Sequence, residues 1–314
     1  MLLETDQGTL PRKVAPVSVL LLTHNEACQV ERCLRSVAGW ADDIHVVDSG
    51  STDETVALAR KYTSHIHFHT YVDHASQLDW SFRNVPFGHD WLALVDADHV
   101  VTPELAGQIQ DAVELDDPRC SAYYARHRYH FGGRPVRGFK PWSLRLMRHA
   151  QVTIDASEMV DYRMVFPGKA GYLPGVIVED NLKERDLDFW IDKHRKFSTR
   201  LAVEQLLRRS GRLRWSIQPA LNGNHDQRMV WLKERWFDLP LFVRPMLYFL
   251  YRYVFKRGFL DGRSGLMYHF RHALWFRMLI DAKIYAFSRQ IKRGERSLDE
   301  LEREFSQSAL GRVA

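Results

Sequence analysis

Short apolar runs alternate with polar and amphipathic segments along the first hundred residues. The apolar runs have the length and composition of buried strands, and the segments between them carry apolar residues at helical spacing. Strands that alternate with helices form a mostly parallel sheet with right-handed crossovers, so the pattern predicts an α/β, Rossmann-like fold. The predicted strands are Pro16–Leu22, Ile44–Val47, His65–His69 and Trp91–Val95, and the predicted helices lie in Ala27–Val37, after Asp53 and around Ala75–Arg83.

Polar loops follow three of these strands and begin at Thr23, Asp48 and Asp96. Because the carboxyl ends of parallel strands meet at one edge of a sheet, we expect the three loops to converge there. The third loop carries two carboxylates spaced i, i+2, Asp96 and Asp98, which suit Mg²⁺ or Mn²⁺ holding a phosphate-bearing substrate. The alternative is a solvated turn with helix-capping acids, since a helix can start at Thr102.

The convergence of polar strand ends favours a nucleotide ligand, whose phosphates a metal and helix N-termini can hold. The sequence contains neither G-x-G-x-x-G after the first strand nor G-x-x-x-x-G-K-[ST]. A dinucleotide dehydrogenase and a P-loop enzyme are therefore disfavoured.

Farther along, basic and aromatic residues alternate. Tyr123–Phe131 and Leu144–Met147 predict strands, which could line an acceptor cleft. Two acids, Glu179 and Asp180, follow an apolar run that ends at Val178. They are candidates for acid-base chemistry, with a place at the start of the next helix as the alternative.

The C-terminal third is basic and aromatic. Pro240–Arg296 holds twelve Lys and Arg against three acids, and Trp231–Phe287 holds sixteen aromatic residues. Leu239–Phe255 is short and charge-interrupted for a transmembrane helix, and predicts instead an amphipathic helix at an anionic membrane surface, its rings in the acyl boundary and its cations on lipid phosphate. The alternative is that these helices pack on each other or on the rest of the protein; nucleic acid is disfavoured because no nucleic-acid motif is present.

Composition places the chain among globular proteins, with 45% hydrophobic and 26% charged residues in 314. Three cysteines form neither a disulfide framework nor a zinc spacing, so a reducing compartment is expected. The first residues lack the pattern of a secretory signal, and export is not expected. We expect a polar leader over residues 1–15, a catalytic domain over 16–225 and a membrane-associating helical region over 226–314.

Three motifs, VSVLLLTHNE, HVVDSGSTDET and WLALVDADHVVTPEL, resemble the nucleotide-sugar-binding half of family 2 glycosyltransferases with the GT-A fold. They are most similar to the bacterial branch that builds lipopolysaccharide core and other envelope glycans. The resemblance is close over 17–105 and looser to about 202. Within the predicted catalytic domain, 16–105 would be the nucleotide-sugar-binding half and 106–225 the acceptor half. It implies that Thr23, Asn25, Glu26, Asp48, Ser49 and Gln77 line the nucleotide-sugar, that Asp96 faces the ribose or the metal, and that Asp98 binds the metal.

The same resemblance extends to later residues. Relatives carry a His-Glu pair whose acid is the catalytic base; Glu158 matches that acid, and Ser157 replaces the histidine. Asp180, beside Glu179, is the competing catalytic acid. Lys193 and His194 match a Trp-x-x-Lys-His stretch of this branch and would approach the donor pyrophosphate, with a solvated helix face as the alternative. At the Gln77 motif, relatives carry a basic residue where this chain has leucine, and helix packing is the alternative role of that glutamine.

The sequence thus predicts an inverting glycosyltransferase that moves a sugar from a nucleotide-sugar, with a UDP-sugar as first choice, to a lipid-linked glycan of the bacterial envelope. We expect it at the cytoplasmic face of the inner membrane, bound peripherally. One alternative is transfer to a polyprenyl phosphate, which needs no base because that acceptor is already anionic. A non-enzymatic alternative is a degenerate nucleotide-binding scaffold that its tail recruits to the membrane.

Overall fold

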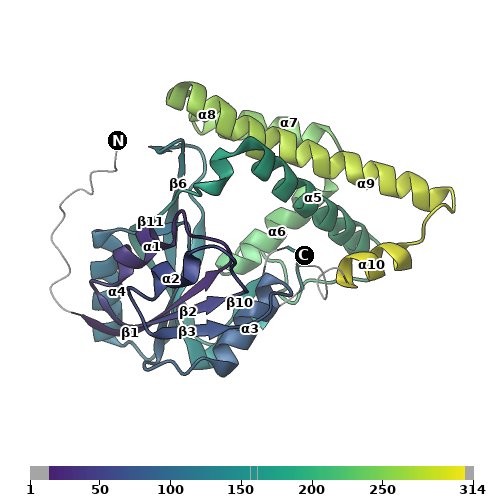
Figure 1. The fold of residues 1–314 in the computed structure, drawn as a ribbon. Helices are drawn as coiled ribbons and strands as arrows, with labels where there is room; N and C mark the ends of the chain where they lie inside the picture. The colour runs from purple at the N-terminus through teal and green to yellow at the C-terminus, as the bar shows by residue number, and fades with distance from the viewer. Residues whose placement is uncertain (1–13, 156, 161, 308–314) are drawn as a thin grey trace. The chain divides into compact units, whose positions relative to one another are not determined.

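The computed structural model describes residues 14–155, 157–160 and 162–307, so residues 1–13 of the expected leader lie outside the described part. The chain forms two compact units (Figure 1). The α/β unit falls within Met1–Tyr71, Ser76–Ile154 and Met164–Arg185, and the helical unit within Val72–Ala75, Asp155–Arg163 and Asp186–Ala314. The division after Arg185 concerns compactness; the functional boundary at 225 stays a prediction.

A mixed sheet with the strand order β3-β2-β1-β4-β8-β6-β11-β5 forms the centre of the α/β unit, and β7 pairs with β6. The first four strands of that order are parallel, β8 runs antiparallel to both of its neighbours, β6 and β11 are parallel, and β5 is antiparallel to β11. The strands are β1 (Ala15–Thr23), β2 (Ala41–Asp48), β3 (His65–Phe68), β4 (Trp91–Asp96), β5 (His99–Val101), β6 (Cys120–Phe131), β7 (Arg134–Pro135), β8 (Trp142–Arg148) and β11 (Lys169–Glu179). Two further short strands, β9 (Thr153–Asp155) and β10 (Arg163–Val165), pair with each other.

The predicted strands and helices of the first hundred residues are confirmed, and so are the strands expected around Tyr123 and Leu144. The helices are α1 (Val30–Val37), α2 (Thr55–Ala59), α3 (His74–Asn84) and α4 (Pro103–Leu115). The last of these begins where Thr102 Oγ1 accepts a hydrogen bond from the Leu105 amide, with proline in the first turn. Because Thr102 caps this helix, Asp96 and Asp98 are not its capping acids.

Alternation along β1 divides its side chains between the two faces of the sheet. One face carries Val17, Val19 and Leu21, which belong to a single buried cluster. Helices α1 and α4 contribute to that cluster, so both cover the same face. The residues that they contribute are Val30, Cys33, Leu34, Val37, Leu105, Ala106, Ile109, Ala112 and Val113.

The helical unit contains most of the aromatic and basic residues of the C-terminal third. Helix α5 packs against α9 through Ala202, Ile280 and Ile284. The helices are α5 (Leu187–Arg209), α6 (His225–Asp238), α7 (Val243–Leu250), α8 (Gly262–His269), α9 (Phe276–Lys292) and α10 (Leu298–Gln307), with π-helical turns at Tyr251–Phe255 and Phe270–Trp275. None of the helices in the described part of the chain combines the length and the apolar character that a bilayer crossing requires.

The expectation that the cations of this region face lipid phosphate is wrong for three buried arginines, Arg244, Arg252 and Arg271. Arg244 and Arg252 are 1% and 3% exposed. Arg244 forms an ion pair with the equally buried Asp281, and the Arg252 guanidinium lies over the rings of Tyr248 and Tyr268. A buried guanidinium needs a partner charge or an aromatic face, and the helical unit supplies both internally.

Candidate functional site

Three neighbouring strands bring their polar ends to one edge of the sheet. In the parallel pairing of β1 with β2, Thr23 lies opposite Asp48, and in the pairing of β1 with β4, Leu22 lies opposite Asp96. The predicted convergence of the three loops is therefore confirmed. It follows from the register of parallel strands, whose carboxyl ends face the same way.

Asp48 organises the loop after β2. Its Oδ1 accepts hydrogen bonds from the backbone amides of Gly50, at 2.9 Å, and Ser51, at 2.8 Å. Its Oδ2 accepts from the hydroxyls of Thr23 and Ser51. Gly50 has φ of 88°, a left-handed conformation that glycine adopts without strain. The predicted nucleotide-binding residues Thr23 and Asp48 thus form one hydrogen-bonded group.

The loop after β1 is fixed to the loop after β2. Asn25 has φ of 54°, its amide donates to Ser51 Oγ at 2.8 Å, and its side-chain oxygen accepts from the Thr52 amide at 2.8 Å. A positive φ is uncommon for a residue other than glycine, and these two hydrogen bonds stabilise it at Asn25. Glu26 forms an ion pair with Lys183, with 2.6 Å between Glu26 Oε1 and Lys183 Nζ. This pair places a cation beside the loop.

Gln77 connects the same edge to α3. Its side-chain Nε2 donates to Ser49 Oγ at 3.1 Å, and His69 Nδ1 donates to its Oε1 at 2.7 Å. The His69 ring stacks on Trp80 with centroids 4.4 Å apart. Gln77 is 1% exposed, so its amide holds Ser49 and His69 in place, and this contact fits the packing alternative; binding of a nucleotide-sugar by Gln77 stays a prediction.

Asp96 and Asp98 lie in the turn between β4 and β5, and each carboxylate has a partner from another strand or loop. Arg145 of β8 donates from Nη1 to Asp96 Oδ2 at 3.0 Å. Asn181, after β11, donates from Nδ2 to Asp98 Oδ2 at 3.0 Å. These contacts orient both carboxylates, as outer-shell partners orient metal ligands.

His99, the first residue of β5, follows the two acids and is 1% exposed. Its Nδ1 accepts a hydrogen bond from the Asp96 amide at 3.0 Å, so the ring proton is on Nε2. That nitrogen lies 3.3 Å from Asp96 Oδ2 and 3.8 Å from both Asp98 Oδ1 and Glu179 Oε2. Burial lowers the pKa of His99, but the three carboxylates outweigh it, and the pKa ends above its ordinary value.

Glu179, the last residue of β11, pairs with the buried His127 of β6. Arg145 Nε donates to His127 Nε2 at 3.3 Å, so that nitrogen is an acceptor, and Nδ1 donates to Glu179 Oε2 at 2.9 Å. Burial lowers the pKa of His127 to about 4. Burial raises the pKa of Glu179, but hydrogen bonds from His127 and His99 outweigh it and lower the pKa overall. The pair is therefore a neutral imidazole that donates to a carboxylate.

The donor set at the turn fits a hard divalent cation. The ligand atoms of Asp96, Asp98 and His99 lie within 4.8 Å of one another, as do those of His99, His127 and Glu179. Both nitrogens of His127 are used in hydrogen bonds, and the hydrogen bond to His99 Nδ1 places the ring proton of His99 on Nε2. The available donors are thus carboxylate oxygens, which favour Mg²⁺ or Mn²⁺ over softer metals.

The competing catalytic acid Asp180 is 2% exposed and forms ion pairs with Arg32 Nη1, at 3.3 Å, and Arg185 Nη2, at 3.2 Å. Helix α5 begins at the N-cap Asp186, so Glu179 and Asp180 do not cap it. Asp180 instead joins two arginines to the end of β11. Its catalytic role stays a prediction.

Glu158, Lys193 and His194 belong to the helical unit. Glu158 is 7% exposed, and its two oxygens form ion pairs with Arg163 Nε, at 2.6 Å, and with Lys233 Nζ. His194 is buried, donates from Nδ1 to the carbonyl of Trp190 and stacks on that ring at 4.0 Å.

Lys193, on the same helix, lies with Nζ 5.8 Å from the centroid of the Phe197 ring. These contacts are internal to the helical unit. The roles of Glu158, Lys193 and His194 in binding or catalysis stay predictions.

Sequence reasoning assigned no role to Arg145, His99, His127 or Lys183. His99 directly follows Asp96 and Asp98, and Arg145 lies within the predicted strand Leu144–Met147, so both stand in segments that the sequence had already singled out. His127 lies in a basic, aromatic strand with no motif of its own. Its partner is decided by the pairing of β6 with β11, which places His127 opposite Ile177 and Tyr129 opposite Glu179.

The fold is an α/β fold of the GT-A type. It has a mixed sheet and an acidic turn at the end of a buried parallel strand. The profile of glycosyl transferase family 2 matches residues 18–174, and the chain belongs to that family. The match includes the loops after β1, β2 and β4, together with Arg145 and His127.

Among the proteins that resemble the chain in sequence are several glycosyltransferases. An uncharacterized glycosyltransferase of Rickettsia bellii is 35% identical over 98 residues, 31% of this chain and 31% of the relative. The chain thus spans about a third of the length of that relative. A lipopolysaccharide core biosynthesis glycosyltransferase, LpsC of Rhizobium meliloti, is 25% identical over 290 residues, 85% of this chain and 96% of the relative.

Two solved structures give a TM-score of 0.40 with this chain. One is glucosyl-3-phosphoglycerate synthase of Mycobacterium tuberculosis, in complex with Mn²⁺, UDP and glucosyl-3-phosphoglycerate, at 19% identity over 64% of this chain and 81% of that one. The other is TarS 1–349 of S. aureus, at 12% identity over 88% of this chain and 91% of that one.

Proposed function

We propose that the chain is an inverting, metal-dependent glycosyltransferase that moves a sugar from a nucleotide-sugar, with a UDP-sugar as first choice, to a lipid-linked glycan acceptor. The observation that carries this proposal is the turn with Asp96 and Asp98, which lies inside the family-matched segment and shares its edge with Thr23 and Asp48. Its oxygen donors are those that hold a divalent cation on a diphosphate.

Asp96 and Asp98 would hold Mg²⁺ or Mn²⁺, which would supply positive charge to the diphosphate of the leaving group. The residues of the chain orient the reactants and accept a proton. Arg145 and Asn181 hold the two metal-binding carboxylates, and Lys183 adds positive charge beside Glu26. A carboxylate, Glu158 or one of the pair Glu179 and Asp180, takes the proton of the acceptor hydroxyl.

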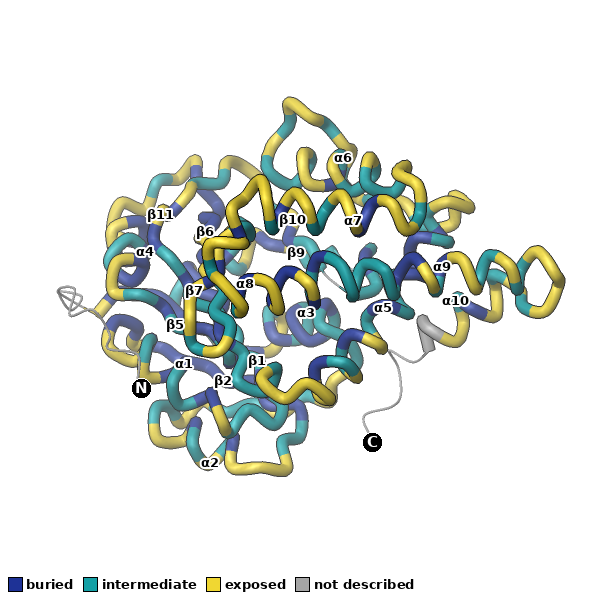
Figure 2. Tube along the Cα trace, turned by 90° about the horizontal axis from the view of Figure 1, so that it is seen from above, coloured by how far each residue is buried: buried dark blue, intermediate teal, exposed yellow. Residues whose placement is uncertain are grey.

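A bacterial envelope acceptor is supported by the similarity to LpsC, which is aligned over most of both chains. A peripheral site at the cytoplasmic face of the inner membrane is supported by the surface of the helical unit. Exposed residues lie along α7 and α8 (Figure 2). The exposed hydrophobic residues on and beside α7 are called here the exposed apolar face. They are Phe242, Val243, Met246, Leu247, Leu250, Tyr251, Val254 and Phe255.

The proposed activity is tested by incubating the full-length protein with a panel of nucleotide-sugars and a bacterial membrane extract, with Mg²⁺ or Mn²⁺ and with chelator. We expect metal-dependent transfer of one sugar to lipid-extractable material. Binding of a nucleotide-sugar with no transfer under any condition would support the scaffold alternative instead.

Glu158→Gln separates the two enzymatic alternatives. If Glu158 is the base for a hydroxyl acceptor, kcat falls by roughly 10²–10⁴-fold. If the acceptor is a polyprenyl phosphate, no base is needed and turnover stays near that of the wild type. The melting temperature must be compared as well, because Glu158 also pairs with Arg163 and Lys233.

The membrane proposal is tested by flotation with vesicles that contain anionic phospholipid. Leu247→Asp and Leu250→Asp, on the exposed apolar face, are expected to weaken flotation, while Leu221→Asp, an exposed leucine outside the helices, is not. Equal flotation by all variants would contradict a membrane role for this face.

A further inference from the structure

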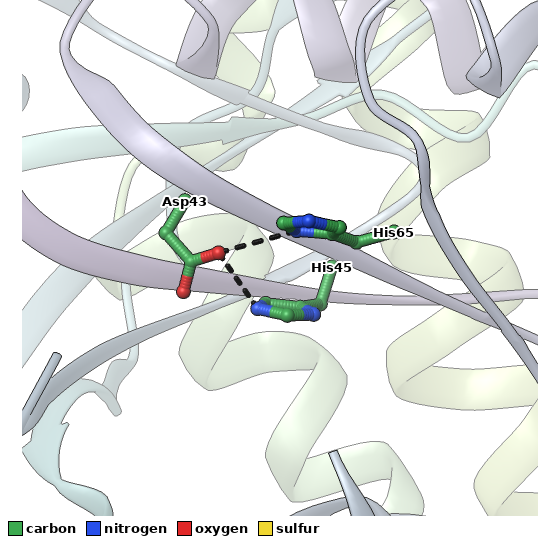
Figure 3. A group of neighbouring side chains, drawn as sticks. All are labelled: Asp43, His45 and His65. Carbon is green, nitrogen blue, oxygen red and sulfur yellow. Dashed lines mark ion pairs between the residues drawn. The ribbon is translucent and has the colours of Figure 1, made fainter. Parts of the chain in front are cut away.

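Three potential metal ligands meet near the amino end of β2, the end opposite Asp48 (Figure 3). His45 of β2 and His65 of β3 lie opposite each other in the parallel register. Asp43 is two residues before His45 and therefore points to the same face of the strand. Asp43 Oδ1 lies 2.8 Å from His45 Nε2 and 3.3 Å from His65 Nδ1.

Further contacts hold two of these ligands in place. The hydroxyl of Ser18 donates to Asp43 Oδ2 at 2.5 Å, and the Gly88 amide donates to the same oxygen at 2.8 Å. Oδ1 is thereby left to face the two rings. On the far side of the His45 ring, Nδ1 lies 3.1 Å from Nε2 of His67, so those two nitrogens share one hydrogen bond. Partners of this kind fix ring orientation and tautomer in metal sites.

The Nε2 atom of His45 is the unusual member of the group. His45 is 1% exposed, and within the described residues its Nε2 makes no hydrogen bond of good geometry, although Asp43 Oδ1 lies 2.8 Å away. Burial lowers the pKa of His45 although Asp43 opposes it. A ring nitrogen without a hydrogen-bond partner is the atom through which histidine binds a metal.

The carboxylate is available as well. Burial raises the pKa of Asp43, but the hydrogen bonds from Ser18 and Gly88 and the nearby His45 outweigh it, and the pKa ends below its ordinary value. Asp43 thus brings a negative charge to the two imidazole rings at neutral pH. A divalent cation placed among them would balance that charge.

We infer that Asp43, His45 and His65 form a second metal site, separate from the D-x-D turn, and that it binds Zn²⁺. One carboxylate oxygen and two imidazole nitrogens are a typical zinc donor set, with water completing the tetrahedron. Ligands about 2.0 Å from zinc stand roughly 3.3 Å apart in a tetrahedron. His65 Nδ1 lies at that separation from Asp43 Oδ1, 3.3 Å, and His45 Nε2 lies closer, at 2.8 Å, so the His45 ring must move outward slightly to share an ion. The inference does not depend on the proposed transferase activity.

The half-exposed His65 makes the site accessible. Its side chain is 54% exposed and begins the edge strand β3. The rings of His45 and His65 are stacked at 4.8 Å, so His65 must rotate about its second side-chain torsion to aim Nδ1 at a shared ion. That torsion is soft in histidine, and solvent allows the movement. Zinc would then tie the edge strand β3 to β2.

The test uses untagged, full-length protein that has been stripped with chelator and titrated with Zn²⁺. Excess Mg²⁺ is present to compete with Zn²⁺ for the carboxylate oxygens of the turn with Asp96 and Asp98. Zinc per chain is measured after equilibrium dialysis, and Co²⁺ is used in parallel to report tetrahedral geometry by its visible absorption. The variants are His65→Ala, His45→Gln and the control His89→Ala. His89 pairs with Asp42 at 2.8 Å, so it is a neighbouring imidazole and carboxylate outside the group.

We expect one zinc per chain in the wild type and in His89→Ala, and a loss of affinity of at least about tenfold in His65→Ala and His45→Gln. Zinc should also raise the melting temperature of the wild type but not that of His65→Ala, because a ligand bound to the folded state stabilises it. Asp98→Asn should abolish sugar transfer and keep the zinc, which separates this site from the proposed function.

Three results would overturn the inference. They are the absence of zinc binding by the wild type, binding by His65→Ala that equals the wild type, and equal weakening by His89→Ala. Because His65 is exposed on an edge strand, His65→Ala is expected to fold, and circular dichroism of the metal-free protein checks this.

Discussion

The two compact units bury charged side chains in different ways. In the α/β unit, Asp48, Asp96 and Glu179 stand at strand ends, where loops and the edge of the sheet meet. In the helical unit, Arg244 and Asp281 form an ion pair between helices, and each is 1% exposed. The first arrangement keeps carboxylates within reach of a ligand, whereas the second satisfies the charges internally.

The difference teaches which property each group of charges should control. Charges at the carboxyl ends of the strands can contact a bound ligand, so their removal should affect activity more than stability. A buried pair inside a helical unit contacts only protein, so the loss of one member should affect stability. Substitutions in the α/β unit therefore test the expected effect on activity, and substitutions in the helical unit test the expected effect on stability.

The largest expected effect is that of Asp98→Asn on sugar transfer. We expect kcat/KM to fall roughly 10⁴-fold, since the proposed metal contributes several kcal/mol of charge stabilisation. The melting temperature should change little. The matched control is Asp111→Asn, on an exposed turn of α4, which should keep wild-type kinetics.

Transfer by the Asp98 variant at the wild-type rate in chelator would break the comparison, because the edge charges would then be structural. A large fall in melting temperature with retained activity would do the same.

Asp281→Asn should have the next largest effect, on stability. Asp281 accepts from Arg244 Nε at 2.8 Å and from the Phe242 amide at 2.8 Å, where Phe242 has φ of 67°. Removing the charge leaves a buried guanidinium unpaired, which costs roughly 3–5 kcal/mol of unfolding free energy. Chemical denaturation measures this difference.

The control for this prediction is Asp238→Asn, which breaks an exposed ion pair with Arg235 and should cost less than about 1 kcal/mol. If the two variants lost similar amounts of unfolding free energy, burial of the Arg244–Asp281 pair would not increase its contribution to stability.

A smaller effect, roughly 2–3 kcal/mol, is expected from pH through His127. In the folded protein the pKa of His127 is about 4, and in the unfolded chain it returns to about 6.5. The unfolded state therefore takes up the proton first, and stability is lost as pH falls from about 6.5 to 4. The lowered pKa of Glu179 acts in the same direction at still lower pH, because its stabilising charge is lost there.

Denaturation midpoints measured between pH 7 and 4 check this expectation, with His127→Gln as the comparison. The variant should show a shallower pH dependence. An unchanged slope would mean that His127 does not control acid stability.

Much of the fold was predictable from the sequence because periodicity is local. The runs Pro16–Leu22 and Trp91–Val95 have no charges and form strands whose central residues are buried. The amphipathic segment around Val30 packs one face as a helix. The polar loops at Thr23 and Asp48 could be placed on one edge, since parallel strands with helical crossovers leave no other arrangement.

The contacts within the site were less predictable. His127 and Glu179 are far apart in sequence, and their contact depends on the register of β6 against β11, which has two irregularities. Arg145 reaches Asp96 only because β8 is inserted antiparallel beside β4. No short motif encodes such pairings, because they follow from long-range strand order.

The sequence by itself determined the class of fold, the edge at which its acids gather and the hard oxygen donors of the D-x-D turn. Only the tertiary structure decided which buried charges face that edge, that Arg244 is paired inside the helical unit, and that Asp43, His45 and His65 meet. The physical reason is that spacing along a chain fixes the face of a strand or helix. Partners across the fold depend instead on register and packing, which many distant residues set together.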